Sequence, residues 1–226
     1  MLILCSIMII MAPLAAMADG RETAKIEVAG DVLKEIIAIP ETTIPPALLS
    51  NASGIAIIPN VIKAGFILGG RYGTGVLVVR DKDGLWSNPS FISITGGSIG
   101  WQIGVESIDI ILVFKNEKSI NRILSGKFTI GADASISAGP VGRGGSAATD
   151  IQLKSEIFSY SRSRGLFAGL SLEGAALIID EEANEKVYGK EGILARDIFS
   201  NKDLKAPEAA DRLKKLLTEY TGRDHK

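Results

Sequence analysis

The sequence has very few of the side chains that serve nucleophilic catalysis and metal binding. Its 226 residues include one cysteine, Cys5, and one histidine, His225. A zinc site of Cys and His ligands, a Ser-His-Asp triad and a Cys-His nucleophile each need at least one more of these residues within the fold. We therefore expect a protein that is not an enzyme, with no metal site and no cofactor.

An excess of charge of one sign is also lacking. The 25 Lys and Arg residues face 26 Asp and Glu residues, and the net charge is −1. Because such a balance gives no global attraction to polyanions, we expect no nucleic-acid partner. Any bound anion must meet a local cluster of cations. The hydrophobic share of 46% is sufficient for one compact core.

Residues 1–18 contain no charged side chain and end in Ala16-Met17-Ala18. An apolar segment closed by small residues is typical of a signal peptide. We therefore expect export with cleavage near Ala18, a location in the periplasm or at the cell envelope, and a single domain over residues 19–226. The alternative is a retained membrane anchor, which the short length of the segment and Pro13 disfavour.

Hydrophobic periodicity predicts helices toward both ends of the domain and strands between them. Helices are predicted at residues 21–39, 116–125, 180–187, 193–199 and 207–220, with one further turn at 45–51. Strands are predicted at residues 54–58, 64–69, 75–80, 90–95, 103–114, 132–138, 156–161, 166–172 and 175–179. Asp81-Lys82-Asp83-Gly84 predicts a hairpin turn.

The 25 glycines suit bulges and tight corners of a sheet. We therefore expect an α+β fold, with a curled or barrel-like antiparallel β-sheet, an N-terminal amphipathic helix and C-terminal helices. Gly69, Gly73 and Gly75 are predicted to lie where a side chain would clash or where φ is positive. Residues 69–75 are followed by a predicted strand rather than a helix, which argues against a dinucleotide-binding motif.

Two arginine-bearing stretches are candidates for anion binding. Residues 139–145 form a glycine-rich loop in which Arg143 could hold a phosphate together with backbone N–H groups. Arg162 and Arg164 lie two residues apart and share one face of a predicted strand with Tyr160. The alternatives are a solvated loop arginine at position 143, and pairing of the other two with acidic residues such as Glu156 or Glu173.

Lys63 and Arg71 bracket the apolar run AGFILGG. They could join the arginines in one cationic patch. The alternative is that each is a charge at the end of a strand.

Four long blocks stand out along the chain: GIAIIPNVIKAGFILGGRYGTGVLVVRDKDGLWSNPSF, FTIGADASISAGPVGR, SYSRSRGLFAGLSLEGAAL and DEEANEKVYG. In order and spacing they resemble the SYLF domain family, over about residues 28–200. The resemblance implies a lipid-binding domain that is not an enzyme. Eukaryotic relatives bind phosphoinositides, some fungal relatives bind and bundle actin beside a Src-homology module, and bacterial relatives are exported.

The resemblance also suggests which helix meets a membrane. In eukaryotic members the amphipathic segment before the glycine-rich strands is associated with membrane contact, and here it corresponds to residues 21–39. Its three cations and four anions sum to −1, so it has no basic face. Since no Src-homology module occurs in the sequence, we expect actin to be an unlikely partner.

We therefore expect a phospholipid-binding module of the bacterial cell envelope that contacts a membrane surface, with anionic lipid as the ligand. Acyl contact is assigned to Val32, Leu33, Ile36 and Ile37, and headgroup contact to Lys63, Arg71, Arg143, Arg162 and Arg164. The alternative is a structural or assembly protein of the envelope that binds a protein partner. The third hypothesis is an enzyme with a hydroxyl nucleophile and a lysine or carboxylate base.

Overall fold

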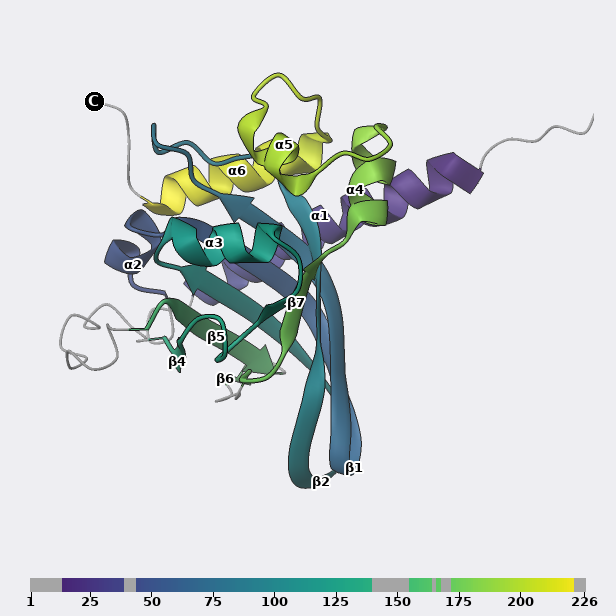
Figure 1. Cartoon of the computed structure of the whole chain (residues 1–226), viewed down its shortest axis with the longest axis vertical. Coiled ribbons are helices and arrows are strands. Elements are labelled where there is room, and N and C mark those ends of the chain that lie inside the picture. Colours follow the sequence, from purple (N-terminus) through teal and green to yellow (C-terminus); the bar gives the residue numbers. More distant parts are fainter. Residues whose placement is uncertain (1–13, 39–43, 140–154, 164–165, 168–171, 222–226) are drawn as a thin grey trace, which may run out of the picture.

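Two long antiparallel strands, β1 (Gly54–Val79) and β2 (Ser90–Phe114), form the centre of the fold (Figure 1). The turn at residues 81–84 joins them, as the sequence predicts, and Gly84 has a φ of 84°. The structure is a computed structural model that describes residues 14–38, 44–139, 155–163, 166–167 and 172–221. For residues 14–19, 65–68, 98–104 and 166–167 it describes the backbone.

Helices come before and after this pair of strands in the sequence (Figure 1). Before it come α1 (Leu14–Ala38) and α2 (Pro46–Ser50), and after it α3 (Glu117–Leu124). Short strands follow: β3 (Phe128–Thr129), β4 (Ile136–Ala138), β5 (Ile157–Ser163), β6 (Leu166–Phe167) and β7 (Ala176–Ile179). The last elements are α4 (Glu181–Tyr188), α5 (Ala195–Ser200) and α6 (Glu208–Thr221). The predicted α+β class is confirmed.

Strand β2 is the central member of the seven-stranded sheet seen among the described residues. One edge of β2 pairs with β1, and the other edge pairs with β7 near its start and with β5 near its end. All pairings are antiparallel except that between β4 and β5, which is parallel. The sheet is therefore mixed rather than purely antiparallel, because alternation along a segment predicts a strand but not the direction of its partner.

Both long strands bend at mid-length, so that the two-stranded ribbon folds over on itself (Figure 1). Gly65 pairs with Gly104, whereas Ile67 pairs with Gly100, which leaves residues 101–103 as an irregularity in β2. Extra residues in one strand bend it and increase its twist. The sequence predicts five separate strands here, but the glycines between the apolar runs lie inside two continuous strands.

The two halves of β1 stack directly against each other at two glycines. A Cβ on Gly75 would lie 2.1 Å from the carbonyl oxygen of Ile57, and a Cβ on Gly73 would lie 2.7 Å from Cγ2 of Val61. The prediction that a side chain would clash at Gly73 and Gly75 is confirmed. These glycines let the ribbon fold over with backbone against backbone.

The strands are buried on both faces, which accounts for their nearly continuous apolar sequence. Ile55 and Ile57 face a cluster shared with α1, α2, α4 and α6, whereas Ala56 and Ile58 face a second cluster that α3 covers. Asn116 begins α3 by accepting a hydrogen bond from the Ser119 N–H at 3.0 Å. The predicted helix boundaries at residues 116 and 180 are therefore confirmed to within one residue.

Candidate functional site

The apolar face of α1, which the sequence assigns to acyl contact, packs into the core. Leu33 and Ile36 are fully buried, Val32 is 5% exposed, and Ile37 is half-buried against the same cluster. The structure therefore differs from the expected lipid-facing surface. An amphipathic helix packs its apolar stripe against the nearest apolar surface, and here β1, β2 and α6 supply that surface.

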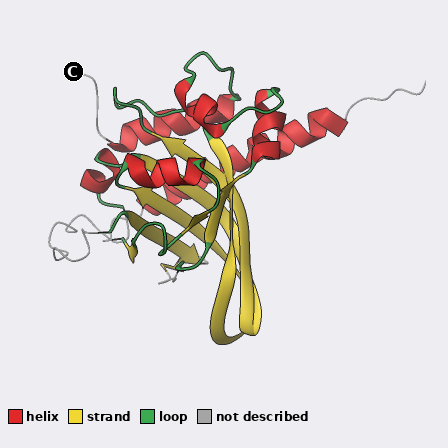
Figure 2. Ribbon diagram, viewed as in Figure 1, coloured by secondary structure: helices red, strands yellow, loops and turns green. Residues whose placement is uncertain are grey.

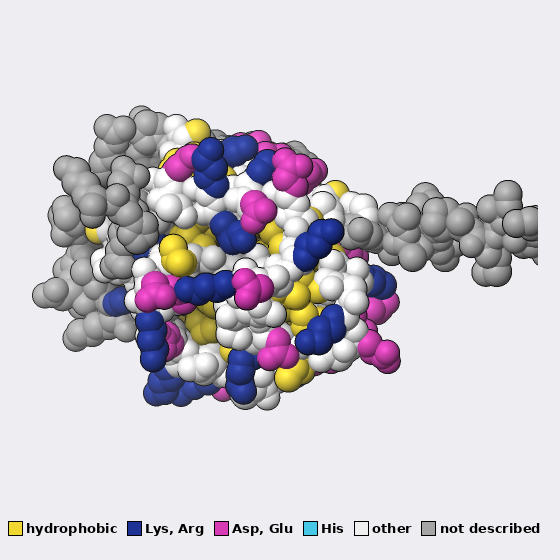
Figure 3. All heavy atoms as spheres, turned by 90° about the horizontal axis from the view of Figure 1, so that it is seen from above, with side chains coloured by type: hydrophobic (Ala, Val, Ile, Leu, Met, Phe, Trp, Pro, Cys, Tyr) yellow, Lys and Arg dark blue, Asp and Glu magenta, His cyan; other side chains and the backbone are white. Residues whose placement is uncertain are grey.

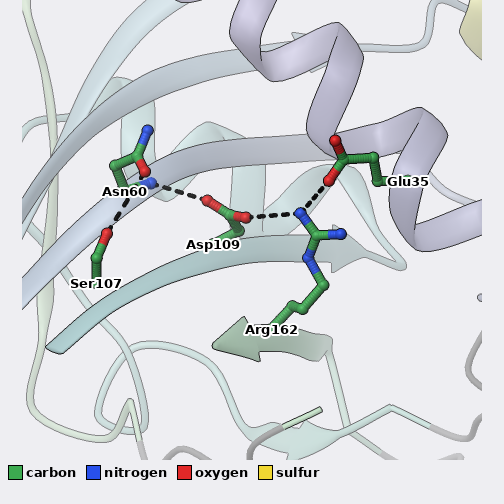
Figure 4. A network of polar contacts seen from close by, with 5 residues as sticks. All are labelled: Glu35, Asn60, Ser107, Asp109 and Arg162. Atoms are coloured by element: carbon green, nitrogen blue, oxygen red, sulfur yellow. Dashed lines mark hydrogen bonds and ion pairs between the residues drawn. The ribbon is translucent and has the colours of Figure 1, made fainter. Parts of the chain in front are cut away.

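A network of polar contacts surrounds Arg162 on β5 (Figure 4). Its guanidinium donates to Asp109 on β2 at 3.1 Å and forms an ion pair with Glu35 on α1. Asp109 also accepts the backbone N–H of Asn60 at 3.0 Å, and Asn60 has a φ of 50° at a register shift in β1. The network therefore joins three strands and a helix.

The Arg162 guanidinium, which the sequence assigns to a phosphate group, is already paired with two carboxylates in this network. One cation and two carboxylates sum to −1, which disfavours an additional anion. Partial burial opposes the charged form, but the hydrogen bonds that Arg162 donates to Glu35 and Asp109 outweigh this effect and raise the pKa of Arg162. The alternative, that this arginine pairs with acidic residues, is confirmed for Arg162. Its partners are Glu35 and Asp109 rather than Glu156 or Glu173.

Of the remaining predicted cations, the structure describes Arg71 and Lys63, and both lie on β1. Arg71 lies on β1, where its guanidinium donates to the carbonyl of Gly97 at 3.2 Å and burial lowers its pKa. Lys63 is half-buried on the same strand, opposite Glu106. Arg143 and Arg164 lie outside the described residues. Tyr160 is buried in the cluster that α1 covers, on the face from which Glu35 reaches Arg162.

A different set of residues forms an open groove where α1 crosses the ribbon. The groove has a volume of about 340 Å³. Its apolar surface includes Val28 from α1, which is 39% exposed, and Ile62 and Tyr72 from β1, which are 51% and 59% exposed. The other residues that line it are Arg21, Ala24, Lys25, Pro59, Asn60, Gly73 and Thr74. We call this feature the α1–β1 groove.

The charge of the α1–β1 groove comes from the start of α1. Arg21 is exposed, and Lys25 is half-buried and forms an ion pair with Glu22 at 2.5 Å. Arg21, Lys25 and Glu22 sum to +1. Cationic and apolar groups therefore lie side by side, as recognition of an anionic amphiphile requires.

Sequence reasoning missed this groove, although part of it was visible. Arg21, Lys25 and Val28 are spaced i, i+4 and i+7, which places them on one face of a helix. That face lies beside the apolar stripe, and charged residues in this position on an amphipathic helix ordinarily face solvent. The contribution of Ile62 and Tyr72 depends on the fold of the ribbon, which no local pattern predicts.

A second groove lies between the 81–88 connection, α5 and α6, with a volume of about 300 Å³. Two of its three lysines are paired with acidic side chains, Lys202 with Asp81 at 3.0 Å and Lys214 with Asp211 at 2.9 Å, and the third, Lys215, is exposed. Its lining has one exposed large apolar side chain, Leu85, compared with three in the α1–β1 groove. This groove is therefore a weaker candidate for an anionic ligand. Within the described ranges, no helix combines the length and apolar character needed to cross a bilayer.

Comparison with known proteins gives the family. The family model described as Las17-binding protein actin regulator, Ysc84, matches residues 95–220. Protein YSC84 of Saccharomyces cerevisiae is 42% identical over 192 residues, covering 82% of this chain and 40% of the relative. SH3 domain-containing YSC84-like protein 1 of Homo sapiens is 36% identical over 199 residues, covering 85% of this chain and 57% of the relative.

The chain therefore spans about half the length of the curated relatives it matches. None of these names denotes an enzyme, and they give no support to the expectation that actin is an unlikely partner. The family model covers more than half of the chain and includes three of the four sequence blocks. The chain belongs to the SYLF, or Ysc84, family.

Proposed function

We propose that this domain is a non-enzymatic module that binds the surface of membranes containing anionic phospholipid, through the α1–β1 groove. The observation that carries the proposal is the position of Arg21 beside the exposed apolar surface of Val28, Ile62 and Tyr72. A phospholipid presents the complementary pair, a phosphate next to acyl chains. The groove replaces both the apolar face of α1 and Arg162 as the proposed contact.

Each part of the groove has a separate chemical task. Guanidinium and ammonium groups gain charge-assisted hydrogen bonds with phosphate oxygens. Apolar side chains gain free energy when they leave water for the acyl region. Tyr72 combines an apolar ring with a hydroxyl group, which is the type of side chain found at membrane–water interfaces.

The location of the protein is part of the proposal. The uncharged residues 1–18 and the small residues before Asp19 support export of the chain, with the domain at the cell envelope or in the periplasm. There the groove would face bacterial phospholipid.

The second candidate function is binding of a protein partner. Its specific support is a relative's name, LAS seventeen-binding protein 3 of Saccharomyces cerevisiae, which is 38% identical over 208 residues. The apolar part of the α1–β1 groove would then hold side chains of an envelope protein or, as in that name, of an actin regulator. This candidate does not require anionic lipid.

Co-sedimentation with vesicles tests the proposal. The full chain and the chain from Asp19 to Lys226 are mixed with phosphatidylcholine vesicles, with and without phosphatidylglycerol. A cation near an anionic surface contributes about 1 kcal/mol, or about fivefold in partitioning. Arg21→Ala with Lys25→Ala should therefore lower binding to anionic vesicles by about fivefold to 25-fold. The loss should shrink at about 1 M salt, where the Debye length is about 3 Å.

Matched cations elsewhere provide the control. Lys205 and Lys215 are exposed on or beside α6, and their replacement by alanine should leave vesicle binding unchanged. Equal losses from the two pairs would show a diffuse charge effect and contradict the groove. Failure of the wild-type chain to sediment with either vesicle would favour a protein partner instead.

A further inference from the structure

The folded-over end of the β1–β2 ribbon projects from the body of the molecule, away from the helices (Figures 1 and 2). We call residues 62–72 of β1 and residues 95–105 of β2 the ribbon tip. Both strands reverse direction there, near the pairs Gly65–Gly104 and Ile67–Gly100. The ribbon tip is therefore the part of the described structure that another large surface can meet first.

Exposed apolar side chains gather at and beside the ribbon tip. Seven large apolar side chains are exposed among the described residues, and Val105, at 71%, is the most exposed of them. Ile62 and Tyr72 belong to the same ribbon, and Val28 faces them across the α1–β1 groove. Val105 and Ile62 share one face, because Ile62 pairs with Ser107 and Ala64 pairs with Val105. Isolated exposed apolar residues are ordinary, but a concentration of them marks an interaction surface.

The charge pattern distinguishes this end of the molecule from the other. Within the ribbon tip, no charged residue occurs between Lys63 and Arg71 or from Thr95 to Val105. The opposite end, around α5 and α6, carries Lys and Arg side chains interspersed with Asp and Glu (Figure 3). The helical end is thus covered by charged side chains, whereas the outermost part of the ribbon tip, between Lys63 and Arg71 and from Thr95 to Val105, is uncharged and partly apolar.

We propose that the ribbon tip enters the interfacial region of a phospholipid bilayer and so sets the orientation of the domain on the membrane. This inference rests on the proposed function and specifies which part of the chain penetrates. Interfacial elements typically bury their apolar groups about 5–10 Å into the boundary between headgroups and acyl chains. Insertion of the ribbon tip would bring the α1–β1 groove toward the headgroups, because Ile62 and Tyr72 belong to both.

Strand geometry gives an order of depths. A strand advances about 3.3 Å per residue, so Ile62 lies about 10 Å along the strand from Gly65 at the bend. Tyr72 lies about 17 Å from Ile67 by the same measure. Val105 directly follows Gly104. Val105 should therefore lie deepest, Ile62 nearer the headgroups, and Tyr72 at the aqueous boundary.

A bilayer fits this surface better than a folded protein does. A stable protein interface covers about 800 Å² on each partner, whereas the end of a narrow ribbon offers little continuous flat area. A bilayer surrounds a projecting element and solvates its exposed apolar side chains on all sides. Lys63, Glu106 and Arg71 lie behind the uncharged segment along the ribbon, where headgroups and water would meet them.

Depth-dependent fluorescence quenching tests the inference. Full-length protein with Cys5→Ser receives one cysteine at a time, through Val105→Cys, Ile62→Cys, Tyr72→Cys or Leu194→Cys, and each is labelled with an environment-sensitive fluorophore. Leu194 is 55% exposed at the start of α5 and serves as the control at the helical end. Vesicles of phosphatidylcholine and phosphatidylglycerol carry quenchers at shallow or deep positions of the acyl chain.

The expected result is strong quenching of the label at position 105, weaker and shallower quenching at position 62, slight quenching at position 72, and none at position 194. As a label-free measurement, Val105→Asp should lower vesicle partitioning at least tenfold, and Leu194→Asp should leave it unchanged. Sedimentation with vesicles while the label at position 105 stays unquenched would overturn the inference and leave the proposed function standing. Absence of sedimentation would instead contradict the proposed function.

Discussion

Gly75 is the residue at which the two halves of β1 come closest. A Cβ there would lie 2.1 Å from the Ile57 carbonyl oxygen and 2.7 Å from Cα of Ile58. Both atoms belong to the backbone of a buried strand, so they cannot move aside as the end of a flexible side chain can. The requirement for glycine therefore comes from a close approach of backbone to backbone.

We expect Gly75→Ala to lower the free energy of unfolding by about 1–3 kcal/mol, the usual cost of overpacking. Gly97→Ala is the matched control, because Gly97 lies on the neighbouring strand and a Cβ there would have no atom within 4 Å. Urea denaturation measures both, through the midpoint at unchanged m-value. Equal midpoints for the two variants would mean that the two halves of β1 are not held together at Gly75.

Helix α1 is attached to the rest of the fold by apolar packing and by two ion pairs between distant elements. Glu35 meets Arg162 of β5, and Glu27 meets Arg212 of α6 at 2.6 Å. The side chains of Glu27 and Arg212 are 51% and 53% exposed. Exposed pairs of this kind contribute at most about 1 kcal/mol each, so the buried apolar face holds the helix in place.

The network around Asp109 should show unequal costs when its members are removed. Asp109→Ala should be the most destabilising change, at about 2–3 kcal/mol, because it leaves both Arg162 and the Asn60 N–H without this acceptor. Arg162→Ala should cost about 1–3 kcal/mol, since the Asp109 side chain is only 16% exposed. Glu35→Ala should cost less than about 1 kcal/mol, because its side chain is 56% exposed.

Thermal or urea unfolding of the three variants, with the Asp109→Ala and Arg162→Ala double variant to complete a cycle, measures these costs. Equal losses from Glu35→Ala and Asp109→Ala would show that the network serves mainly to attach α1. Additive losses in the double variant would show that Asp109 and Arg162 do not interact energetically.

Helix boundaries that carry capping residues were predictable because capping signals are local, whereas α1 begins at Leu14 rather than at the predicted residue 21. Asn116 and Asp180 each accept a backbone N–H at a helix start, and Gly126 and Gly189 have positive φ values just after a helix end. Strand lengths were less predictable. Glycines inside β1 and β2 resemble breaks in the sequence, although in the fold they mark a bend and a close contact between layers.

The candidate site was harder to predict than the fold, for two physical reasons. An apolar stripe on α1 has the same sequence pattern whether it packs on a sheet or on a membrane. Only the tertiary fold, which places the sheet against this stripe, distinguishes the two. The two ion partners of Arg162 are distant in the sequence: Asp109 is 53 and Glu35 is 127 residues away along the chain. Local spacing placed Arg162 and Tyr160 on one face of a strand but carried no information about the carboxylates that pair with Arg162.

At the scale of the whole molecule, two ends differ in composition and shape. The helical end carries mixed charges (Figure 3), and the other end is the projecting ribbon tip (Figure 1), which is uncharged between Lys63 and Arg71 and from Thr95 to Val105. One orientation on a membrane matches the composition of both ends to their surroundings, with the ribbon tip in lipid and the charged helices in water. In the proposed arrangement, the cations of the α1–β1 groove lie near the membrane surface, where anionic headgroups attract them.

The contact at Gly73 and Gly75 should also divide the ribbon into regions of different local stability. On the body side of this contact the strands are sandwiched between two apolar clusters, whereas beyond it the two strands depend mainly on each other. Amide hydrogen exchange of the free protein should therefore be slow at Ile57 and Leu77 and should become faster toward Gly65. Bound vesicles should slow the exchange most at the bend, since lipid would exclude water from amides that thermal opening otherwise exposes.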